Sequence, residues 1–159
     1  MNAKQRLEKD CDKLCSGIVR LRDKGKCRLC GQPGCDPHHI ARKSGNVRWF
    51  IDNLIWTCRK CHDHDDELNM NINVVRVIGA EKFEELQMMA REIKQWKQAD
   101  LKILKSDLTE ILNYYKAKEV YELLHIFWLW DICLYLGYGC DSDAFIIASR
   151  SSVSLSLSA

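Results

Sequence analysis

The sequence predicts an α+β fold, mostly helical overall, in which flanking α-helices surround a small core stapled by zinc. Two observations predict this fold. Two cysteine pairs enclose a segment rich in Gly, Pro, Asn and Ser, a composition typical of loops. Apolar residues recur at three- and four-residue spacings before and after that segment, as they do in amphipathic helices. The predicted regions are a basic N-terminal helix (1–26), the zinc-stapled core (27–70), a helical extension (71–122), and an apolar segment with a disordered polar tail (123–159).

The first predicted element is a basic amphipathic helix over residues 3–24, which Gly25 is expected to end. The apolar positions on one side of this helix are Leu7, Leu14, Ile18 and Leu21. The core that follows is expected to hold two short strands, around His38–Ile40 and near Leu54–Thr57. A helix is then expected from Arg59 to about Met70, because its composition is helix-forming with acidic residues early.

Three more helices are expected in the extension. The first covers Asn71–Ile78 and is closed by Gly79 as a C-terminal cap. The second covers Ala80–Lys97. Its expected core-facing positions are Phe83, Leu86, Met89, Ala90, Ile93 and Trp96. The third follows an N-cap at Asp100 and runs to about Lys118. The chain then turns aromatic and apolar before it ends in a polar tail.

The composition is that of a soluble globular protein, with 47% hydrophobic and 29% charged residues. The formal net charge of +2 hides an asymmetry. Residues 1–62 contain 14 Lys/Arg and 6 Asp/Glu, a net charge of +8, whereas residues 63–159 contain 10 and 16, a net charge of −6. A basic first part favours contact with nucleic acid, although solvated charge on helices produces such asymmetry too. No apolar stretch is long enough to span a membrane, so no membrane partner is expected.

The cysteine pairs Cys27–Cys30 and Cys58–Cys61 both follow the pattern Cys-x2-Cys. Two residues between thiolates let both sulfurs reach one tetrahedral zinc from a single tight turn, and Gly31 favours such a turn. Two facing turns make a closed four-thiolate site, which is structural. The N-terminus carries no export signal, so a reducing cytoplasm is expected, where paired cysteines are interpreted first as metal ligands.

Haem attachment is a competing interpretation of Cys58–His62, which fits the pattern C-x-x-C-H. It needs export to an oxidising compartment and leaves the other cysteine pair unexplained, so zinc is favoured. The remaining cysteines are given no ligand role. Cys35 is expected to be a spare thiol, Cys11 and Cys15 ordinary helix residues, and Cys133 and Cys140 core residues.

Four of the five histidines, His38, His39, His62 and His64, cluster in or just beyond the segment between the cysteine pairs. Exposed loop residues or alternative zinc ligands are the simpler interpretations, but the clustering favours a function. The order C-x2-C, then HHI at 38–40, then DNLIWTCRKCH at 52–62 resembles the motif of HNH (ββα-metal, or His-Me finger) endonucleases. The resemblance implies a zinc-stapled ββα-metal core that hydrolyses DNA phosphodiester bonds with a divalent cation.

The resemblance also implies a role for each residue of the motif. His38 and His62 would bind the catalytic cation, Mg²⁺ or Mn²⁺, with His64 replacing or assisting His62. His39 would be the general base, and Asn53 would hydrogen-bond across the loop and hold it in place. Phosphodiester hydrolysis needs an attacking water, a base and a cation, and the base should not itself bind the metal. On a regular strand His38 and His39 would face opposite ways, so this stretch must be irregular.

Basic residues between the motifs are expected to bind DNA backbone phosphates without sequence preference. They are Arg42, Lys43, Arg48, Arg59 and Lys60. Trp49 lies among them, and packing under the zinc loop is favoured for it over stacking on an exposed base.

A longer resemblance covers roughly residues 20–118 and points to phage NinG/Rap-type recombination nucleases. It is carried by VRWFIDNLIWTCRKCH, Ile78-Gly79, KFEEL and the step from Trp96 to Leu101. Those HNH-like proteins act on branched DNA such as Holliday junctions and D-loops. The resemblance therefore implies recombination intermediates as substrate and a host cytoplasm as location. His62 departs from the Asn usual in that group, and the apolar C-terminus has no counterpart in it.

Two other classes of function stay open. One is a non-catalytic zinc-binding module that binds nucleic acid. The other is a protein-interaction protein, suggested by the acidic helices and the aromatic stretch Phe127–Tyr138. Because such apolar surface is rare on monomers, that stretch predicts a homo-oligomer or a contact with another subunit.

Overall fold

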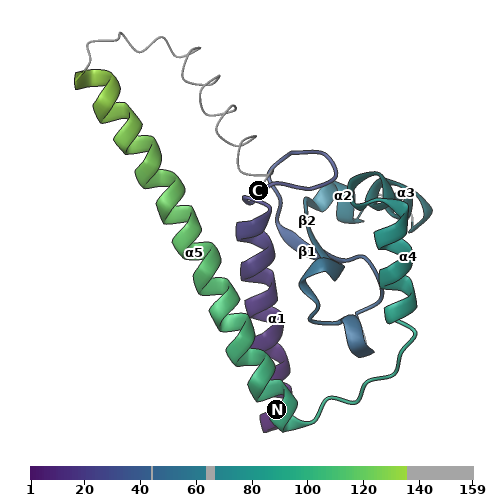
Figure 1. Ribbon diagram of the computed structural model, residues 1–159. Helices are drawn as coiled ribbons and strands as arrows, with labels where there is room; N and C mark the ends of the chain where they lie inside the picture. The colour runs from purple at the N-terminus through teal and green to yellow at the C-terminus, as the bar shows by residue number, and fades with distance from the viewer. Residues whose placement is uncertain (44, 64–66, 136–159) are drawn as a thin grey trace. The chain divides into compact units, whose positions relative to one another are not determined.

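The computed structural model describes residues 1–43, 45–63 and 67–135 of the chain. His64 and the polar tail lie outside these residues, and the side chain of Cys133 is not described. The chain divides into two compact units, Met1–Ala117 and Lys118–Ala159. The described part is mostly helical with one small antiparallel sheet, as expected (Figure 1).

The first helix, α1, covers Ala3–Arg22 and confirms the expected basic amphipathic helix. Asn2 caps it: its side chain accepts a hydrogen bond from Gln5 N at 2.8 Å, and the Gln5 side chain accepts one from Asn2 N at 2.9 Å. This reciprocal pair satisfies two amide groups that a helix start leaves without partners. The helix ends within a turn of the expected position, where Gly25 N donates to Arg20 O at 2.8 Å.

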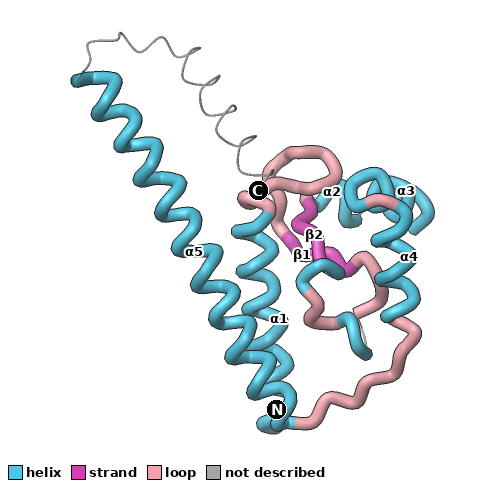
Figure 2. Tube along the Cα trace, in the orientation of Figure 1, coloured by secondary structure: helices cyan, strands magenta, loops and turns pink. Residues whose placement is uncertain are grey.

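The sheet pairs β1 (Asp36–His39) with β2 (Leu54–Thr57), drawn in magenta in Figure 2. The expected strands are confirmed, except that Ile40 lies just beyond β1. His38 is opposite Ile55 and His39 is opposite Leu54 in the register. All residues of β2 are buried, so this strand lies in the interior of the first unit.

Two apolar clusters meet at β2, because successive side chains of a strand point to opposite faces. Leu54 and Trp56 belong to a cluster with α1 and the first turns of α5 (Gln98–Tyr135), whereas Ile55 belongs to a cluster with α3 (Glu67–Ile78) and α4 (Ala80–Met89). The members of the first cluster from the two helices are Cys11, Cys15, Ile18, Val19, Leu101 and Leu108. Within the first unit, α1 therefore lies between the start of α5 and the sheet (Figure 1).

The next helices divide the chain differently from expectation. The single helix expected from Arg59 to Met70 is replaced by α2 (Arg59–Asp63) and α3 (Glu67–Ile78). The α3 helix thus takes in the segment expected as a separate helix from Asn71. Its expected end at Gly79 is confirmed: φ there is 86° and Gly79 N donates to Val75 O at 2.9 Å.

The helix expected over Ala80–Lys97 is wrong in its second half, because α4 covers only Ala80–Met89. Beyond it, Ile93 is 89% exposed rather than core-facing. Trp96 explains the change. Its ring packs edge-on against Trp49 with centroids 5.3 Å apart, and its Nε1 donates to Gly45 O at 3.0 Å. These tertiary contacts outweigh the local helix preference.

The last helix, α5, covers Gln98–Tyr135. It starts before the expected N-cap, so Asp100 lies in its first turn, where its carboxylate accepts a hydrogen bond from Lys97 N at 2.9 Å. The expected end near Lys118 is also wrong, because the sequence holds no Gly or Pro stop signal until Gly137. Over residues 1–43, 45–63 and 67–135, no helix combines the length and apolar character needed to cross a membrane.

Candidate metal centre and histidine cleft

Four cysteine sulfurs converge at one point of the core. The Sγ atoms of Cys27, Cys30, Cys58 and Cys61 all lie within 4.8 Å of one another, and those of Cys30 and Cys58 are 3.6 Å apart. Four thiolates about 2.3 Å from one tetrahedral zinc would be roughly 3.8 Å from each other. The cluster therefore fits a zinc ion.

Backbone hydrogen bonds shape the first cysteine turn. Gly31 N donates to Cys27 O at 2.8 Å, with Gly31 in the left-handed region (φ 75°) that other residues rarely adopt. Arg28 N donates to Trp56 O at 2.9 Å and ties this turn to β2. Close packing adds a constraint, because a Cβ at Gly34 would collide with the Trp56 indole.

The second turn starts where β2 ends. Cys58 follows the strand directly and Cys61 lies in α2, with His62 N donating to Cys58 O at 3.0 Å. A hydrogen bond from the Cys61 backbone amide lowers the pKa of the Cys58 thiol to about 7, whereas burial and the neighbouring thiols of Cys30 and Cys58 raise the pKa of Cys61. Four crowded sulfurs cannot all ionise without a nearby cation, so the donor set is suited to a metal.

The other described cysteines lie outside the cluster. Cys11 and Cys15 are buried in α1, as expected of ordinary helix residues, and burial raises the pKa of Cys15 to about 12. Cys35 is exposed, with its Sγ 3.2 Å from Asp36 Oδ2. Because Cys58 and Cys61 converge with the first pair, the geometry favours a shared metal over haem attachment.

Three of the expected site histidines line one cleft of about 380 Å³. His38 and His39 come from the end of β1 and His62 from α2. The rings of His38 and His62 are nearly perpendicular, with centroids 5.3 Å apart. His38 and His39 thus line the same cleft although they are consecutive on β1. This is possible because His39 is the last residue of the strand, where the regular alternation of side chains ends.

The His39 ring has a defined hydrogen bond. Its Nε2 lies 3.1 Å from the carbonyl oxygen of Arg48. A carbonyl oxygen can only accept, so Nε2 carries the proton and Nδ1 keeps its lone pair. Burial lowers the pKa of His39. Burial also lowers the pKa of His38 to about 4, and the neighbouring imidazoles of His62 and His39 add to this shift. Both rings are therefore neutral at neutral pH.

Asn53 is fully buried and bridges the loop between the strands. Its Oδ1 accepts from Ala41 N at 2.7 Å, and its Nδ2 donates to Val47 O at 3.0 Å. Ala41 lies two residues beyond His39, and Val47 precedes Arg48. Asn53 thus fixes the backbone next to His39 and next to Arg48, whose carbonyl oxygen accepts the His39 proton. Among the hydrogen bonds of the described residues, none joins Asn53 to the His39 ring itself.

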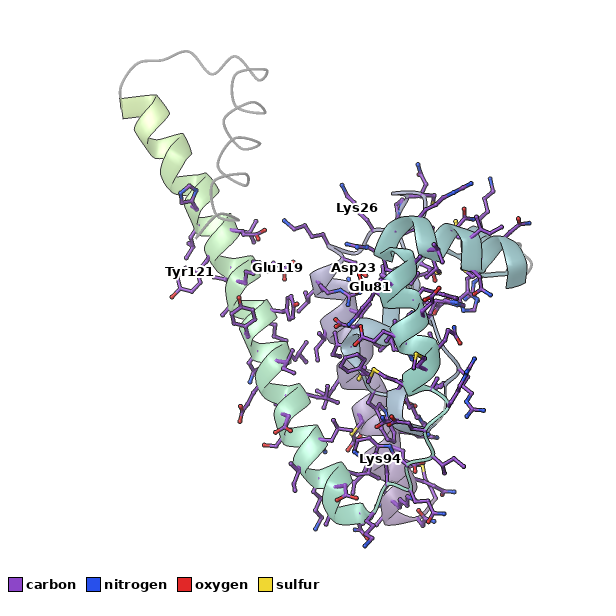
Figure 3. All side chains as sticks on the ribbon, turned by 45° about the vertical axis from the view of Figure 1, so that its right-hand side comes forward. Asp23, Lys26, Glu81, Lys94, Glu119 and Tyr121 are labelled. Atoms are coloured by element: carbon purple, nitrogen blue, oxygen red, sulfur yellow. The ribbon has the colours of Figure 1, made fainter. Side chains whose placement is uncertain are left out.

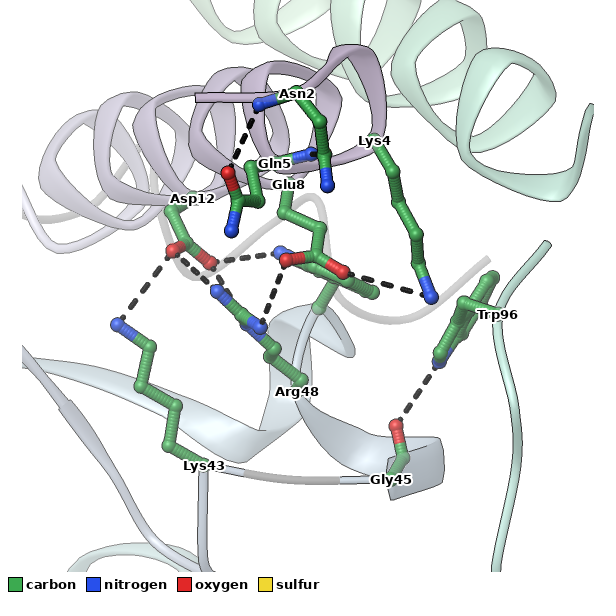
Figure 4. Close-up of polar contacts among 10 residues, drawn as sticks. Asn2, Lys4, Gln5, Glu8, Asp12, Lys43, Gly45, Arg48 and Trp96 are labelled. Carbon is green, nitrogen blue, oxygen red and sulfur yellow. Dashed lines mark hydrogen bonds and ion pairs between the residues drawn. The ribbon is translucent and has the colours of Figure 1, made fainter. Parts of the chain in front are cut away.

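Asp12 of α1 is a cleft residue that the sequence did not single out (Figure 4). Its carboxylate accepts from Arg48 Nε at 3.2 Å, Arg48 Nη2 at 2.9 Å and Trp49 Nε1 at 2.8 Å. Burial opposes ionisation, but the hydrogen bonds from Arg48 and Trp49 outweigh it and keep the pKa of Asp12 below its ordinary value. No local pattern marks Asp12, because its partners lie far along the chain.

Most of the basic residues expected on DNA are engaged by protein groups. Arg48 and Lys43 face Asp12, with Lys43 Nζ 3.6 Å from Asp12 Oδ2, and Arg59 Nη2 lies 3.0 Å from Asp36 Oδ2. Arg42 is exposed and donates to a backbone carbonyl, and Lys60 is exposed. Trp49 is 4% exposed, so it is packed rather than presenting a face for stacking, and its apolar neighbours come from α1, β2 and α5.

In comparisons with known proteins, no protein-family model, curated protein or solved structure matches the chain.

Proposed function

We propose that the chain is a metal-dependent DNA endonuclease of the HNH (ββα-metal) type, which hydrolyses phosphodiester bonds. The observation that carries this proposal is the state of His39. Its Nε2 proton is committed to Arg48 O at 3.1 Å, and its pKa is lowered, so a neutral ring keeps Nδ1 available as a base. A general base needs this state at neutral pH and a fixed orientation.

In this proposal His39 Nδ1 accepts a proton from water while the water oxygen bonds to phosphorus. The leaving oxygen departs with the electron pair of the broken P–O bond and takes a proton from solvent, so one strand is nicked. Asn53 and the Arg48 carbonyl keep the ring in place during this step. A preorganised base of this kind contributes roughly 10²–10⁴-fold to rate.

His38 and His62 are the residues that would hold the catalytic cation. Two imidazoles on one cation have centroids roughly 5 Å apart, because each nitrogen lies about 2.1 Å from the metal, and the observed separation is 5.3 Å. Imidazole nitrogen suits transition metals, whereas Mg²⁺ prefers oxygen ligands, so this pair favours Mn²⁺ over Mg²⁺. The cation would supply charge neutralisation on the phosphate.

The four-cysteine cluster is assigned a structural zinc, since four thiolates leave no open coordination position for substrate. Branched recombination intermediates, Holliday junctions or D-loops, are proposed as substrate only on the resemblance to NinG/Rap-type nucleases. The proposed partners are DNA and, through the exposed apolar residues of α5, a second copy of the chain.

A non-catalytic zinc module that binds nucleic acid is the second candidate. The observation that favours it is the cluster itself: among the described residues, these four cysteines are the only group of three or more ligand side chains close enough to share one ion. Such a module would bind DNA and zinc but would not cleave.

A plasmid-nicking assay separates the two candidates. We expect nicking by the wild-type protein with Mn²⁺, and with Mg²⁺ more slowly. The substitution His39→Ala should reduce nicking at least about 100-fold while zinc content and DNA affinity are retained. His125→Ala is the matched control, because His125 is an exposed histidine of α5 that does not line the histidine cleft; it should nick at the wild-type rate.

Equal nicking by wild-type and His39→Ala protein would refute the assignment of the base. DNA binding without nicking in either metal would favour the non-catalytic module.

A further inference from the structure

A second cavity, of about 980 Å³, shares His38, His39 and His62 with the cleft beside α1. Its other walls come from the residues that follow β1, from α3 and from α4 with the residues after it. Because the three histidines belong to both cavities, a ligand in the larger one lies directly against them. A cavity this size holds more than the single phosphate on which the histidines would act.

Among the side chains that the structure describes, those lining the larger cavity differ in charge from those lining the smaller cleft. Arg42 and Arg91 line it, and no Asp or Glu occurs among its described lining residues. In the smaller cleft, by contrast, Lys43 and Arg48 face the carboxylate of Asp12. The positive charge of the smaller cleft is thus offset internally, whereas the larger cavity presents two arginines to a ligand.

Arg42 is held in a fixed orientation by a neutral partner. Its Nε and Nη2 both donate to Ala90 O, at 3.1 and 2.9 Å. An arginine has five N–H donors, so three remain for a ligand, and a carbonyl partner leaves the charge uncompensated. Arg91, the residue after Ala90, lines the same cavity. Gln87 Nε2 donates to Ile40 O at 3.4 Å and ties α4 to the chain just beyond His39.

We propose that the larger cavity is the groove in which the nucleic-acid strand lies, with Arg42 and Arg91 binding backbone phosphates next to the phosphodiester at the histidines. This inference rests on the proposed function, because it takes the histidines as the reacting end of the groove. Guanidinium groups match phosphate geometry and read no base, so binding here is independent of sequence. Arg91 joins the proposed DNA-binding residues, whereas Lys43 and Arg48 pair with Asp12 in the smaller cleft.

The test measures binding apart from cleavage. A fluorescein-labelled DNA duplex is titrated with His39→Ala protein without added divalent cation, and anisotropy gives the dissociation constant between about 50 and 200 mM salt. We expect Arg91→Gln and Arg42→Gln each to weaken binding at low salt and to reduce the slope of log affinity against log salt by about one. Arg91→Lys, which keeps the charge, should retain the slope.

Arg76→Gln is the matched control, because Arg76 is an exposed arginine of α3 that lines neither cavity. It should leave the slope unchanged. Melting curves check folding, and Arg91→Gln carries the test if loss of the Ala90 contact unfolds Arg42→Gln.

The proposed groove would be overturned by any of three results. These are an unchanged slope in Arg91→Gln, a loss of slope in Arg76→Gln equal to that in Arg91→Gln, or no DNA binding by the parent protein. Failure of the nuclease gives a different result: arginine-dependent binding would persist while wild-type protein nicks no plasmid. Conversely, if the wild-type protein nicks plasmid but the arginine variants bind DNA as well as their parent, the proposed groove is wrong and the proposed nuclease function is retained.

Discussion

At the scale of single residues, the cleft depends on a relay from α1 to the proposed base. Asp12 holds the side chains of Arg48 and Trp49 with three hydrogen bonds of 2.8–3.2 Å. The backbone carbonyl of Arg48 in turn accepts the Nε2 proton of His39. A carboxylate on a helix thus fixes the backbone segment that orients an imidazole on a strand, without touching the imidazole itself.

Replacing Asp12 by Ala should destabilise this segment. The Trp49 Nε1 proton would lose its acceptor in a ring that is 4% exposed, and such a loss costs about 1–3 kcal/mol. A lower melting temperature by circular dichroism and slower nicking are expected. Asp10→Ala is the control: Asp10 is an acid of the same helix in an exposed pair with Lys105, and it should melt close to wild type.

The Asp12 contribution also depends on pH. Its pKa in the folded chain is below the ordinary value of 3.8, so the stabilisation is present above that value and is lost as the pH falls through the lowered pKa. If Asp12→Ala and Asp10→Ala melted alike at neutral pH, the relay would not hold the segment.

At the scale of elements, the cysteine cluster joins the end of β2 and the start of α2 to the turn after α1. Elements this short make few backbone hydrogen bonds and cannot fix their mutual positions alone. The residues they carry include His62, one of the two proposed ligands of the catalytic cation. Thiolates bound to one ion would therefore hold the histidine cleft in shape from outside it.

Cys58→Ser tests this arrangement at the level of folding. Structural zinc contributes about 10–16 kcal/mol in zinc-finger peptides, which is as large as the net stability of a typical domain, about 5–15 kcal/mol. The variant should lose bound zinc, measured by mass spectrometry of metals. It should also lose its cooperative melting transition. Cys35→Ser removes an exposed neighbouring thiol instead and should keep both properties. A well-folded Cys58→Ser protein would contradict a structural zinc.

At the scale of the whole molecule, the described part of α5 beyond the first unit exposes apolar side chains. Val120, Tyr121, Leu123 and Leu124 are each more than half exposed, and Figure 3 shows the Tyr121 side chain pointing away from the helix. Large exposed apolar patches are rare on monomers, and these four side chains lie close together along one helix. This exposed apolar surface supports the proposed self-association of the chain.

Light scattering should give a mass of at least two chains. Tyr121→Gln combined with Leu124→Gln should lower that mass by removing apolar contact area. Lys116→Gln combined with Glu119→Gln alters exposed polar residues of the same helix and should leave it unchanged. A wild-type mass equal to one chain would rule out self-association through α5.

Sequence alone determined the features that depend on near neighbours. Cys-x2-Cys spacing brings two sulfurs to one turn wherever it occurs, so both cysteine turns were predictable. The three- and four-residue periodicity of apolar side chains predicted α1, and short stretches bounded by loop residues predicted both strands. The roles of His38, His39, Asn53 and His62 stay a prediction, now with a geometry that can be tested.

Tertiary structure decided where distant residues meet. Trp96 lies outside α4, contrary to expectation, because it contacts Trp49 and Gly45. Asp12 reaches Arg48, and Arg42 reaches Ala90, across long stretches of chain. Periodicity and spacing encode which face of an element is apolar, but they carry no record of which other element that face will contact. That choice depends on the packing of the whole core.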